Sequence, residues 1–234
     1  MKLVILAGGY GTRISEETKL KPKPLIKIGN KPIIWHLMKI YSTFGIKEFI
    51  ICVGYKGYMI REQLAKYQIN ENWKIKFVNT GLHTMTGGRV KRIQKYLDKD
   101  NNFCLSYGDG LSNVNIKKLI TFHLNRNKIA TLTAVKYKNP KGILSINKIL
   151  NVSSIKEKPI EYINGGFFVL STKIFKYLKN DRTIFEKDCL PTLSKNNQLL
   201  AFKHDGFWAC MDTLREKKEL NSLWKNKKCD WKIW

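Results

Sequence analysis

Strand-like runs alternate with segments of helical periodicity along most of this 234-residue chain, and this alternation restricts its fold more than any other feature. Runs rich in β-branched and aromatic residues predict strands at 2–7, 47–54, 74–78, 102–109 and 129–135. Between them, apolar residues recur at helical spacing near 33–44, 58–67, 88–97 and 116–125. The pattern predicts an α/β fold, a Rossmann-like mixed, mostly parallel sheet flanked by helices.

The ends of the first helix can be read from single residues. Asn30 can cap a helix that has Pro32 in its first turn, and Gly45 can end it. Beyond residue 135 the pattern changes to short β segments, followed by helical segments near 172–178 and 186–194. We expect this second half to extend the same sheet, so that residues 1–234 form a single domain, which their number allows.

The net charge of +25 raises the question of a nucleic-acid partner. Lysine outnumbers arginine 36 to 7 and is scattered along the whole chain, a pattern typical of solvated lysine faces. We therefore expect no nucleic acid as the main partner, although the positive field attracts nucleotides. An RNA- or DNA-binding protein remains an alternative, and a steep salt dependence of oligonucleotide binding would favour it.

Other bulk features indicate a cytoplasmic protein without a membrane partner. No apolar run approaches the roughly 20 residues that span a bilayer. The opening MKLVILAGG runs directly into a glycine loop, which favours a buried strand over a signal sequence. The five cysteines are odd in number and form no CxxC pair, so they indicate neither a disulfide framework nor a zinc module.

A glycine-rich loop, LAGGYGTR at 6–13, follows the first predicted strand. It fits neither the GxxxxGK[ST] loop nor the GxGxxG dinucleotide fingerprint. Its glycines nevertheless let backbone N–H groups approach an anion, and Thr12 and Arg13 add a hydroxyl donor and a fixed charge. Phosphate binding is the prediction, and a tight turn with a surface arginine is the alternative.

Shortly after this loop, the segment KPKP at 21–24 places Lys23 between two prolines. The prolines hold the backbone extended and remove two N–H donors, so the segment is suited to pointing one side chain in a set direction. A lysine so placed next to a glycine loop can neutralise a phosphate. A rigid exposed linker is the alternative.

Two aspartates follow apolar segments in the manner of metal ligands. Asp109 in SYGDG ends a predicted strand, and ligands of open α/β sheets bind beyond the carboxyl ends of the strands. Asp212 in FWACMDT ends another apolar segment. Carboxylates beside a polyphosphate usually hold Mg²⁺. A DG turn and a helix N-cap are the respective alternatives.

Three weaker motifs offer polar groups at positions where glycine allows close approach. MTGGR at 85–89 can cradle a base or phosphate, or simply start a helix. KEKP at 156–159 and INGG at 163–166 offer groups able to bind a sugar and its phosphate. Each motif is weak by itself.

Taken in order, LAGGYGTR, KPKPL, TGGR, YGDG, EKP, NGGFFVL and MDT resemble the motifs of the sugar-phosphate nucleotidyltransferases. The resemblance runs almost end to end. Within that family the stretches CVGYKGY, MTGGRVKR and FWACMDTLREKKELNSLW are most like the branch that uses CTP and α-D-glucose 1-phosphate. Two departures stand out. The passage around 67–78 is shorter than in that branch, which leaves a possible homo-oligomer an open question. The segment 137–144 keeps only Gly142 where the family has a proline-glycine-arginine-phenylalanine run before a glycine.

The resemblance assigns roles to residues of this chain. It implies that Arg13 and Lys23 act at the reacting α-phosphate, that Asp109 and Asp212 hold Mg²⁺, and that further residues bind the two substrates. The nucleotide would contact Leu6, Ala7, Gly8, Gly9, Gly11, Thr12, Thr84, Thr86, Gly88, Arg89 and Gly108 as well as Arg13 and Lys23, and the sugar phosphate would contact Gly142, Glu157, Lys158, Asn164 and Gly165.

The implied activity is transfer of a nucleotidyl group to a sugar 1-phosphate, and two other readings stay open. The same reaction with another nucleotide or sugar is one, because one polar contact to a base edge can set that choice. A non-catalytic nucleotide-sensing domain on the same fold is the other, because a fold does not fix function.

Overall fold

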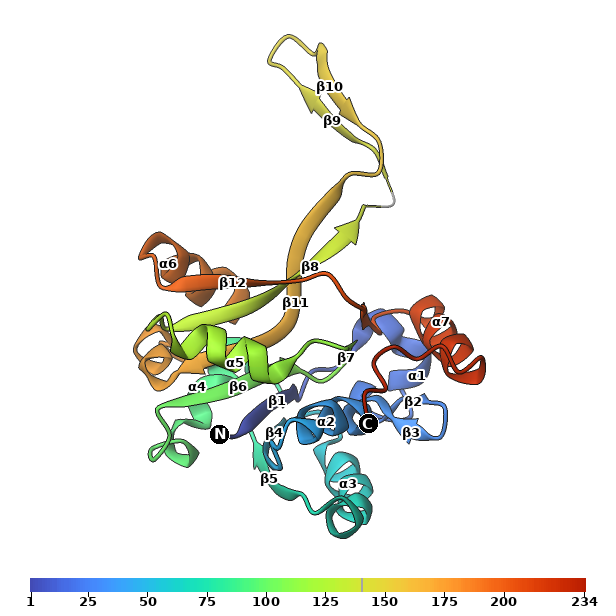
Figure 1. The fold of residues 1–234 in the computed structure, drawn as a ribbon, viewed down its shortest axis with the longest axis vertical. Helices are drawn as coiled ribbons and strands as arrows, with labels where there is room; N and C mark the ends of the chain where they lie inside the picture. The colour runs from blue at the N-terminus through green and yellow to red at the C-terminus, as the bar shows by residue number, and fades with distance from the viewer. Residues whose placement is uncertain (140) are drawn as a thin grey trace.

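A seven-stranded sheet forms the centre of the molecule in a computed structural model, which describes residues 1–139 and 141–234 (Figure 1). Its strand order is β12 (Leu199–His204), β8 (Ala130–Lys138), β11 (Ile160–Ser171), β6 (Asn102–Tyr107), β1 (Leu3–Ala7), β4 (Glu48–Val53) and β5 (Lys74–Asn79). Only β11 runs antiparallel to its neighbours β6 and β8 in this described sheet. The predicted mixed, mostly parallel sheet is confirmed.

Helices cover both faces of this sheet. They are α1 (Ser15–Thr18), α2 (Ile33–Thr43), α3 (Gly57–Glu71), α4 (Thr86–Arg92), α5 (Ile116–Leu124), α6 (Leu190–Lys195) and α7 (Leu214–Lys225). Tighter 3₁₀ turns are η1 (Thr12–Ile14), η2 (Lys23–Leu25), η3 (Gln94–Tyr96) and η4 (Thr172–Tyr177), and η5 (Phe185–Cys189) is a π-helical turn. In the described residues no helix is both long enough and apolar enough to cross a membrane.

The core is divided into two apolar clusters by the central strands. Leu3 and Ile5 of β1 point to the cluster beneath α2 and α5, whereas Val4 points to the cluster beneath α4 and α6. This alternation is the period of two that a strand imposes on its side chains. A strand with apolar residues on both faces must lie inside the molecule, and β1 does.

Two short ribbons lie beside the main sheet. β2 (Lys27–Ile28) pairs with β3 (Lys31–Pro32), and β7 (Gly110–Ser112) pairs with β13 (Trp208–Cys210). The first ribbon overturns one prediction. Asn30 does not cap α2, because Lys31 and Pro32 are held in the ribbon and leave Asn30 in its turn.

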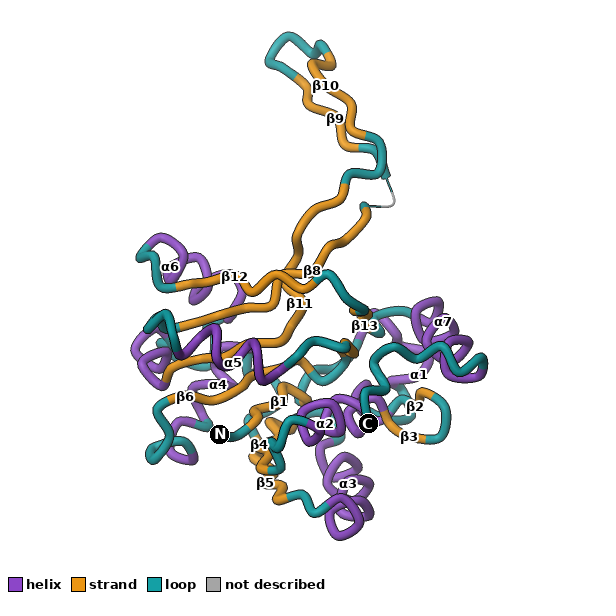
Figure 2. Tube along the Cα trace, viewed as in Figure 1, coloured by secondary structure: helices purple, strands orange, loops and turns teal. Residues whose placement is uncertain are grey.

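The second half extends the sheet through β8, β11 and β12 as expected, but part of it leaves the body of the molecule. Among the described strands, β9 (Ile143–Ile146) and β10 (Val152–Lys156) pair only with each other, and they project outward as an arm (Figure 2). We define the arm as residues 141–159. Most of its apolar side chains are exposed, up to 83% at Leu150.

Candidate active site

A cavity of about 840 Å³ lies beyond the carboxyl ends of β1 and β6. This is the position at which open α/β sheets bind ligands. Most of the residues predicted to bind substrates line it, namely Leu6, Ala7, Gly8, Gly9, Gly11, Arg13, Lys23, Thr84, Thr86, Arg89, Gly108, Asp109, Asn164, Gly165 and Asp212. The topology therefore brings together motifs that are far apart in the sequence.

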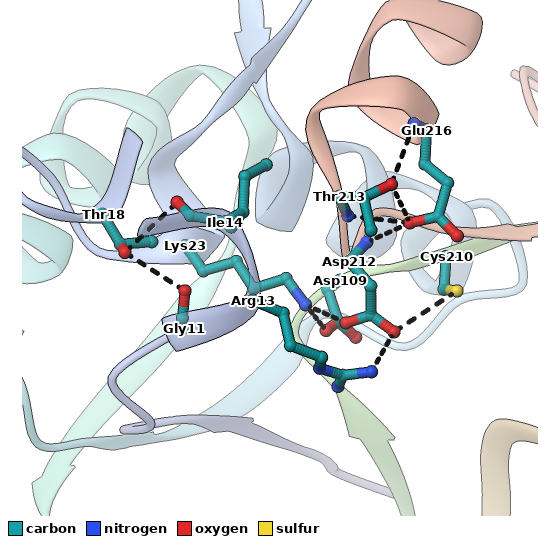
Figure 3. Close-up of polar contacts among 10 residues, drawn as sticks. All are labelled: Gly11, Arg13, Ile14, Thr18, Lys23, Asp109, Cys210, Asp212, Thr213 and Glu216. Carbon is teal, nitrogen blue, oxygen red and sulfur yellow. Dashed lines mark hydrogen bonds and ion pairs between the residues drawn. The ribbon is translucent and has the colours of Figure 1, made fainter. Parts of the chain in front are cut away.

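An ion-pair cluster occupies one side of this cavity (Figure 3). The Lys23 ammonium group donates to Asp109 Oδ2 and to Asp212 Oδ1, each at 2.5 Å. Arg13 Nη1 donates to Asp212 Oδ2 at 2.7 Å, and the Arg13 side chain is 72% exposed. Two cations and two carboxylates therefore meet where the sequence predicted phosphate and metal binding.

Short-range structure fixes the positions of the two aspartates. Asp109 precedes β7 and Asp212 follows β13, so the β7–β13 ribbon brings them side by side. Thr213 caps α7 and shares a capping box with Glu216, whose carboxylate also accepts from the backbone N–H of Asp212 at 2.7 Å. The cap of α7 is therefore Thr213, and the side chain of Asp212 faces the cavity.

Lys23 is held on the cavity wall by its own segment. Pro22 has the extended backbone that the sequence predicts, with φ −65° and ψ 146°, and Lys23 begins the turn η2. Burial would lower the pKa of Lys23, but the charges and hydrogen bonds of Asp109 and Asp212 raise it above its ordinary value. Lys23 is thus a fixed positive charge at neutral pH.

Arg89 also lines the cavity, but its guanidinium group binds the protein backbone. Nη2 donates to the carbonyl of Gly8 at 3.0 Å, and Nη1 donates to the carbonyl of Gly81 at 2.8 Å and to Thr80 Oγ1 at 2.7 Å. Arg89 therefore ties the glycine loop to the loop after β5 and shapes this part of the cavity.

Five predicted residues do not line the cavity. Thr12 begins η1, and Gly88 packs within α4 against Asp181, where an added Cβ would lie 2.6 Å from the Asp181 backbone. Gly142, Glu157 and Lys158 lie on the arm, outside the cavity lining. A role of these arm residues in sugar-phosphate binding stays a prediction.

Sequence reasoning missed a second polar cluster that lines the cavity. Glu186 Oε1 accepts from the Tyr107 hydroxyl at 2.6 Å, and Oε2 accepts from the Thr86 hydroxyl at 2.7 Å. Asn164 Nδ2 donates to the Tyr107 oxygen at 3.3 Å. Tyr107 lies within the SYGDG motif, so the sequence offered a signal for it. Glu186 lies in no motif.

The donor set at the ion-pair cluster fits a hard divalent cation. Asp109 and Asp212 both reach one Lys23 nitrogen, so their oxygens face one point. Within the described residues, no three His, Cys, Asp or Glu side chains gather as a ready metal site. Two carboxylates suit Mg²⁺, which takes one or two of them and completes its shell with waters and substrate phosphates. These residues can hold such an ion together with a bound phosphate.

Comparisons with known proteins agree with this geometry. The nucleotidyl transferase family model matches residues 2–222. The chain is 46% identical over 257 residues to the glucose-1-phosphate cytidylyltransferase of Salmonella typhimurium. It is 41% identical over 255 residues to the probable glucose-1-phosphate cytidylyltransferase of Bacillus subtilis. Both comparisons cover 100% of this chain and 100% of the relative.

Solved structures share the fold as well. HddC from Yersinia pseudotuberculosis has a TM-score of 0.76 and 28% identity, covering 95% of this chain and 99% of that chain. A putative glucose-1-phosphate thymidylyltransferase from Bacillus anthracis has the same TM-score, 0.76, at 20% identity, covering 95% and 94%, and supports the fold alone. With the family model matched along nearly the whole chain and the predicted motifs gathered at one cavity, the chain belongs to the nucleotidyl transferase family.

Proposed function

We propose that the chain transfers a cytidylyl group from CTP to α-D-glucose 1-phosphate, releasing pyrophosphate and forming CDP-glucose. The observation that carries the proposal is the meeting of Lys23, Arg13 and two aspartates beside the glycine loop. The choice of CTP and glucose 1-phosphate rests on the full-length likeness to the Salmonella and Bacillus subtilis proteins. We also propose that the reaction takes place in the cytoplasm.

The proposed reaction is an in-line displacement. A phosphate oxygen of the sugar 1-phosphate attacks the α-phosphorus of CTP, and the bond from that phosphorus to the bridging oxygen of pyrophosphate breaks. The attacking oxygen is already anionic near pH 7, so the step needs no general base. The main barrier is the approach of two anions, and positioning and charge neutralisation lower it.

The chain's own residues supply that neutralisation. Lys23, buried and cationic, binds the α-phosphate, and the exposed Arg13 side chain closes over it from the solvent side. Backbone N–H groups of the loop at 8–11 approach the phosphates, since Gly9 leaves its Cβ position open. Asp109 and Asp212 would hold Mg²⁺, which neutralises charge on the triphosphate and on the leaving pyrophosphate when bound.

The two substrates are assigned to different parts of the cavity wall. The nucleotide lies against Thr84 and Thr86 and along the glycine loop, which Arg89 ties to the loop after β5. The sugar phosphate lies against Asn164 and Gly165 of β11. The three arm residues are left out of this assignment because they lie outside the cavity lining.

The test is pyrophosphate release from purified protein with Mg²⁺, α-D-glucose 1-phosphate and each of CTP, UTP, dTTP, ATP and GTP in separate reactions. Strong preference for CTP is expected. Turnover with a different nucleotide would keep the chemistry and reject the cytidylyl assignment. Nucleotide binding without release in any reaction, tested also with other hexose 1-phosphates, would instead identify a non-catalytic nucleotide-sensing domain.

A further inference from the structure

Glu186 is an acidic group on the cavity wall that the proposed reaction does not use. Its two oxygens accept from two neutral hydroxyl groups, those of Tyr107 and Thr86. Among the ion pairs of residues 1–139 and 141–234, none includes Glu186. Within the described residues, the side-chain partners of this carboxylate are therefore neutral.

The hydrogen bonds around Glu186 all point toward it. The backbone N–H of Phe185 donates to Thr86 Oγ1 at 2.9 Å, which leaves the Thr86 proton for the carboxylate. On the other side, Asn164 donates to the Tyr107 oxygen, and Tyr107 donates to Glu186. Burial and the charge of Glu186 raise the pKa of Tyr107, so this phenol keeps its proton. The network fixes both carboxylate oxygens.

The carboxylate retains unused capacity to accept hydrogen bonds. An ionised carboxylate offers about four lone-pair sites, and the two hydroxyl donors occupy two of them. A partly buried charge that lacks full hydrogen bonding costs free energy. Since Glu186 lines the cavity, donors on a bound ligand can satisfy the remaining sites. Hydroxyl groups of a pyranose are such donors, and hydrogen bonds to a charged acceptor are strong.

Glu186 joins two parts of the cavity wall, because its donor Thr86 is assigned to the nucleotide and its donor Tyr107 bonds to Asn164, which is assigned to the sugar phosphate. The Tyr107–Asn164 side of the network belongs to the wall assigned to the sugar phosphate, and Gly165 beside it accepts a hydrogen bond from Trp208 Nε1 at 2.7 Å. Glu157 of KEKP lies on the arm, outside the cavity lining, and its role at the sugar phosphate stays a prediction. Among the described lining residues, Glu186 is the carboxylate that hydrogen bonds through Tyr107 link to Asn164.

We propose that Glu186 is a specificity-determining residue that accepts hydrogen bonds from hydroxyl groups of the hexose and so selects a fully hydroxylated sugar 1-phosphate. The inference rests on the proposed function. Tyr107 and Thr86 hold the carboxylate in place, and Asn164 extends the same polar surface along β11.

The experiment compares wild type with Glu186→Gln, using glucose 1-phosphate and its 2-, 3-, 4- and 6-deoxy analogues with CTP and Mg²⁺. Asp188→Asn is the matched control, because Asp188 lies on the same turn, accepts from the Ile184 backbone and does not line the cavity. Tyr107→Phe provides a second variant, which removes one donor to Glu186 and keeps the ring. Circular dichroism checks folding of each protein.

In wild type, loss of the recognised hydroxyl should lower kcat/KM by roughly 10- to 100-fold, since a site built to bind a hydroxyl group rejects an analogue that lacks it. Glu186→Gln should raise the KM for glucose 1-phosphate by a similar factor, leave the KM for CTP within about threefold, and abolish the discrimination between the sugar and that analogue.

Three results would separate the possible failures. Wild type without turnover would refute the proposed function itself. An active wild type with unchanged sugar discrimination in Glu186→Gln, or with the same loss in Asp188→Asn, would overturn the role of Glu186. A raised KM for CTP, or a loss of preference for CTP over UTP with normal sugar kinetics, would assign Glu186 to the base instead.

Discussion

Lys23 shows how far single residues can be interpreted before a structure is known. The flanking prolines predict a fixed, directed lysine near the glycine loop, and its position on the cavity wall agrees with that prediction. Its partners could not be predicted from local sequence, because Asp109 and Asp212 lie 86 and 189 positions away. Local sequence patterns indicate which interactions a side chain can make, and the topology of the fold determines which residues it contacts.

Replacement of Lys23 tests its proposed role at the α-phosphate. Lys23→Ala should lower kcat/KM for CTP by roughly 100- to 1000-fold, since it removes one preorganised positive charge from the reacting centre. Lys21→Ala is the control, because Lys21 lies in the same segment and pairs with Glu17 at 3.5 Å. Steady-state pyrophosphate release measures both. Equal losses in the two variants would mean that general positive charge, rather than Lys23, matters.

Glu186 and Arg89 mark the limits of residue-scale prediction. Glu186 has no flanking glycine, proline or repeated acidic residue, so nothing in its neighbourhood distinguishes it from a surface glutamate. Arg89 is predicted to contact the nucleotide and lines the cavity, and its bonds to the carbonyls of Gly8 and Gly81 could not be read from its motif. Both cases depend on which loops the fold brings together.

At the scale of elements, a glycine of α4 and a glycine of the first loop have different structural roles. MTGGR was expected to start a helix or cradle a ligand, and it does start α4. Gly88 lies against the backbone of Asp181, however, so its lack of a side chain serves close packing of two segments. Gly9 in the first loop has nothing within 4 Å of its Cβ position and faces the cavity.

Alanine substitutions at these two glycines should give opposite results. Gly88→Ala should lower the free energy of unfolding by about 1–3 kcal/mol, because the added methyl group forces the two backbones apart. Gly9→Ala should leave that free energy within about 0.5 kcal/mol of wild type and reduce activity, since the methyl group obstructs the phosphates. Urea unfolding and pyrophosphate release measure the two effects. A stable Gly88→Ala protein would contradict the packing role.

Helix α2 provides a pH-sensitive contact with the end of the chain. His36 is fully buried, its Nε2 lies 2.9 Å from the Ile28 carbonyl, and its ring packs on Trp224 and Trp231. Burial, with a smaller contribution from Lys31, lowers the pKa of His36 to about 4. The folded protein therefore keeps this imidazole neutral under conditions in which the unfolded chain protonates it.

Stability should accordingly fall on acidification. A folded pKa below the unfolded value near 6.5 contributes stability above pH 6.5, and this contribution is lost as the pH falls toward 4. From this group alone, the free energy of unfolding should fall by about 2 kcal/mol between pH 7.5 and pH 5. Urea unfolding of wild type, His36→Gln and the exposed His83→Gln at both values tests this. An unchanged slope in His36→Gln would contradict it.

At the scale of the whole molecule, the alternation of strands and helices predicted the sheet, and the resemblance predicted where the ligand cavity lies. The arm was not foreseen, although the segments that form it were recognised as β. Short alternating strands at 143–146 and 152–156 look alike in sequence whether they extend a central sheet or pair only with each other. The hydrophobic pattern indicates which face of a strand is buried, but it does not determine which strands it pairs with.

The isolation of the arm yields a test of the architecture. Replacement of residues 143–156 by a short turn should change the free energy of unfolding by less than about 1 kcal/mol, because β9 and β10 bond only to each other and a shorter loop closes readily. Urea denaturation of the shortened protein measures this. A cooperative loss of the folded state would show that the arm stabilises the central sheet.

The long separation between Lys23 and Asp212 sets an order in time as the chain is synthesised. Strands β1, β4 and β5 can pair early, but Asp212 follows Lys23 by 189 positions, which at typical rates takes roughly 10 to 40 s to translate. β11 must also enter between β6 and β8 before the sheet is complete. A growing chain therefore carries the glycine loop and Lys23 long before it carries Asp212, and fragments released early lack the complete ion-pair cluster.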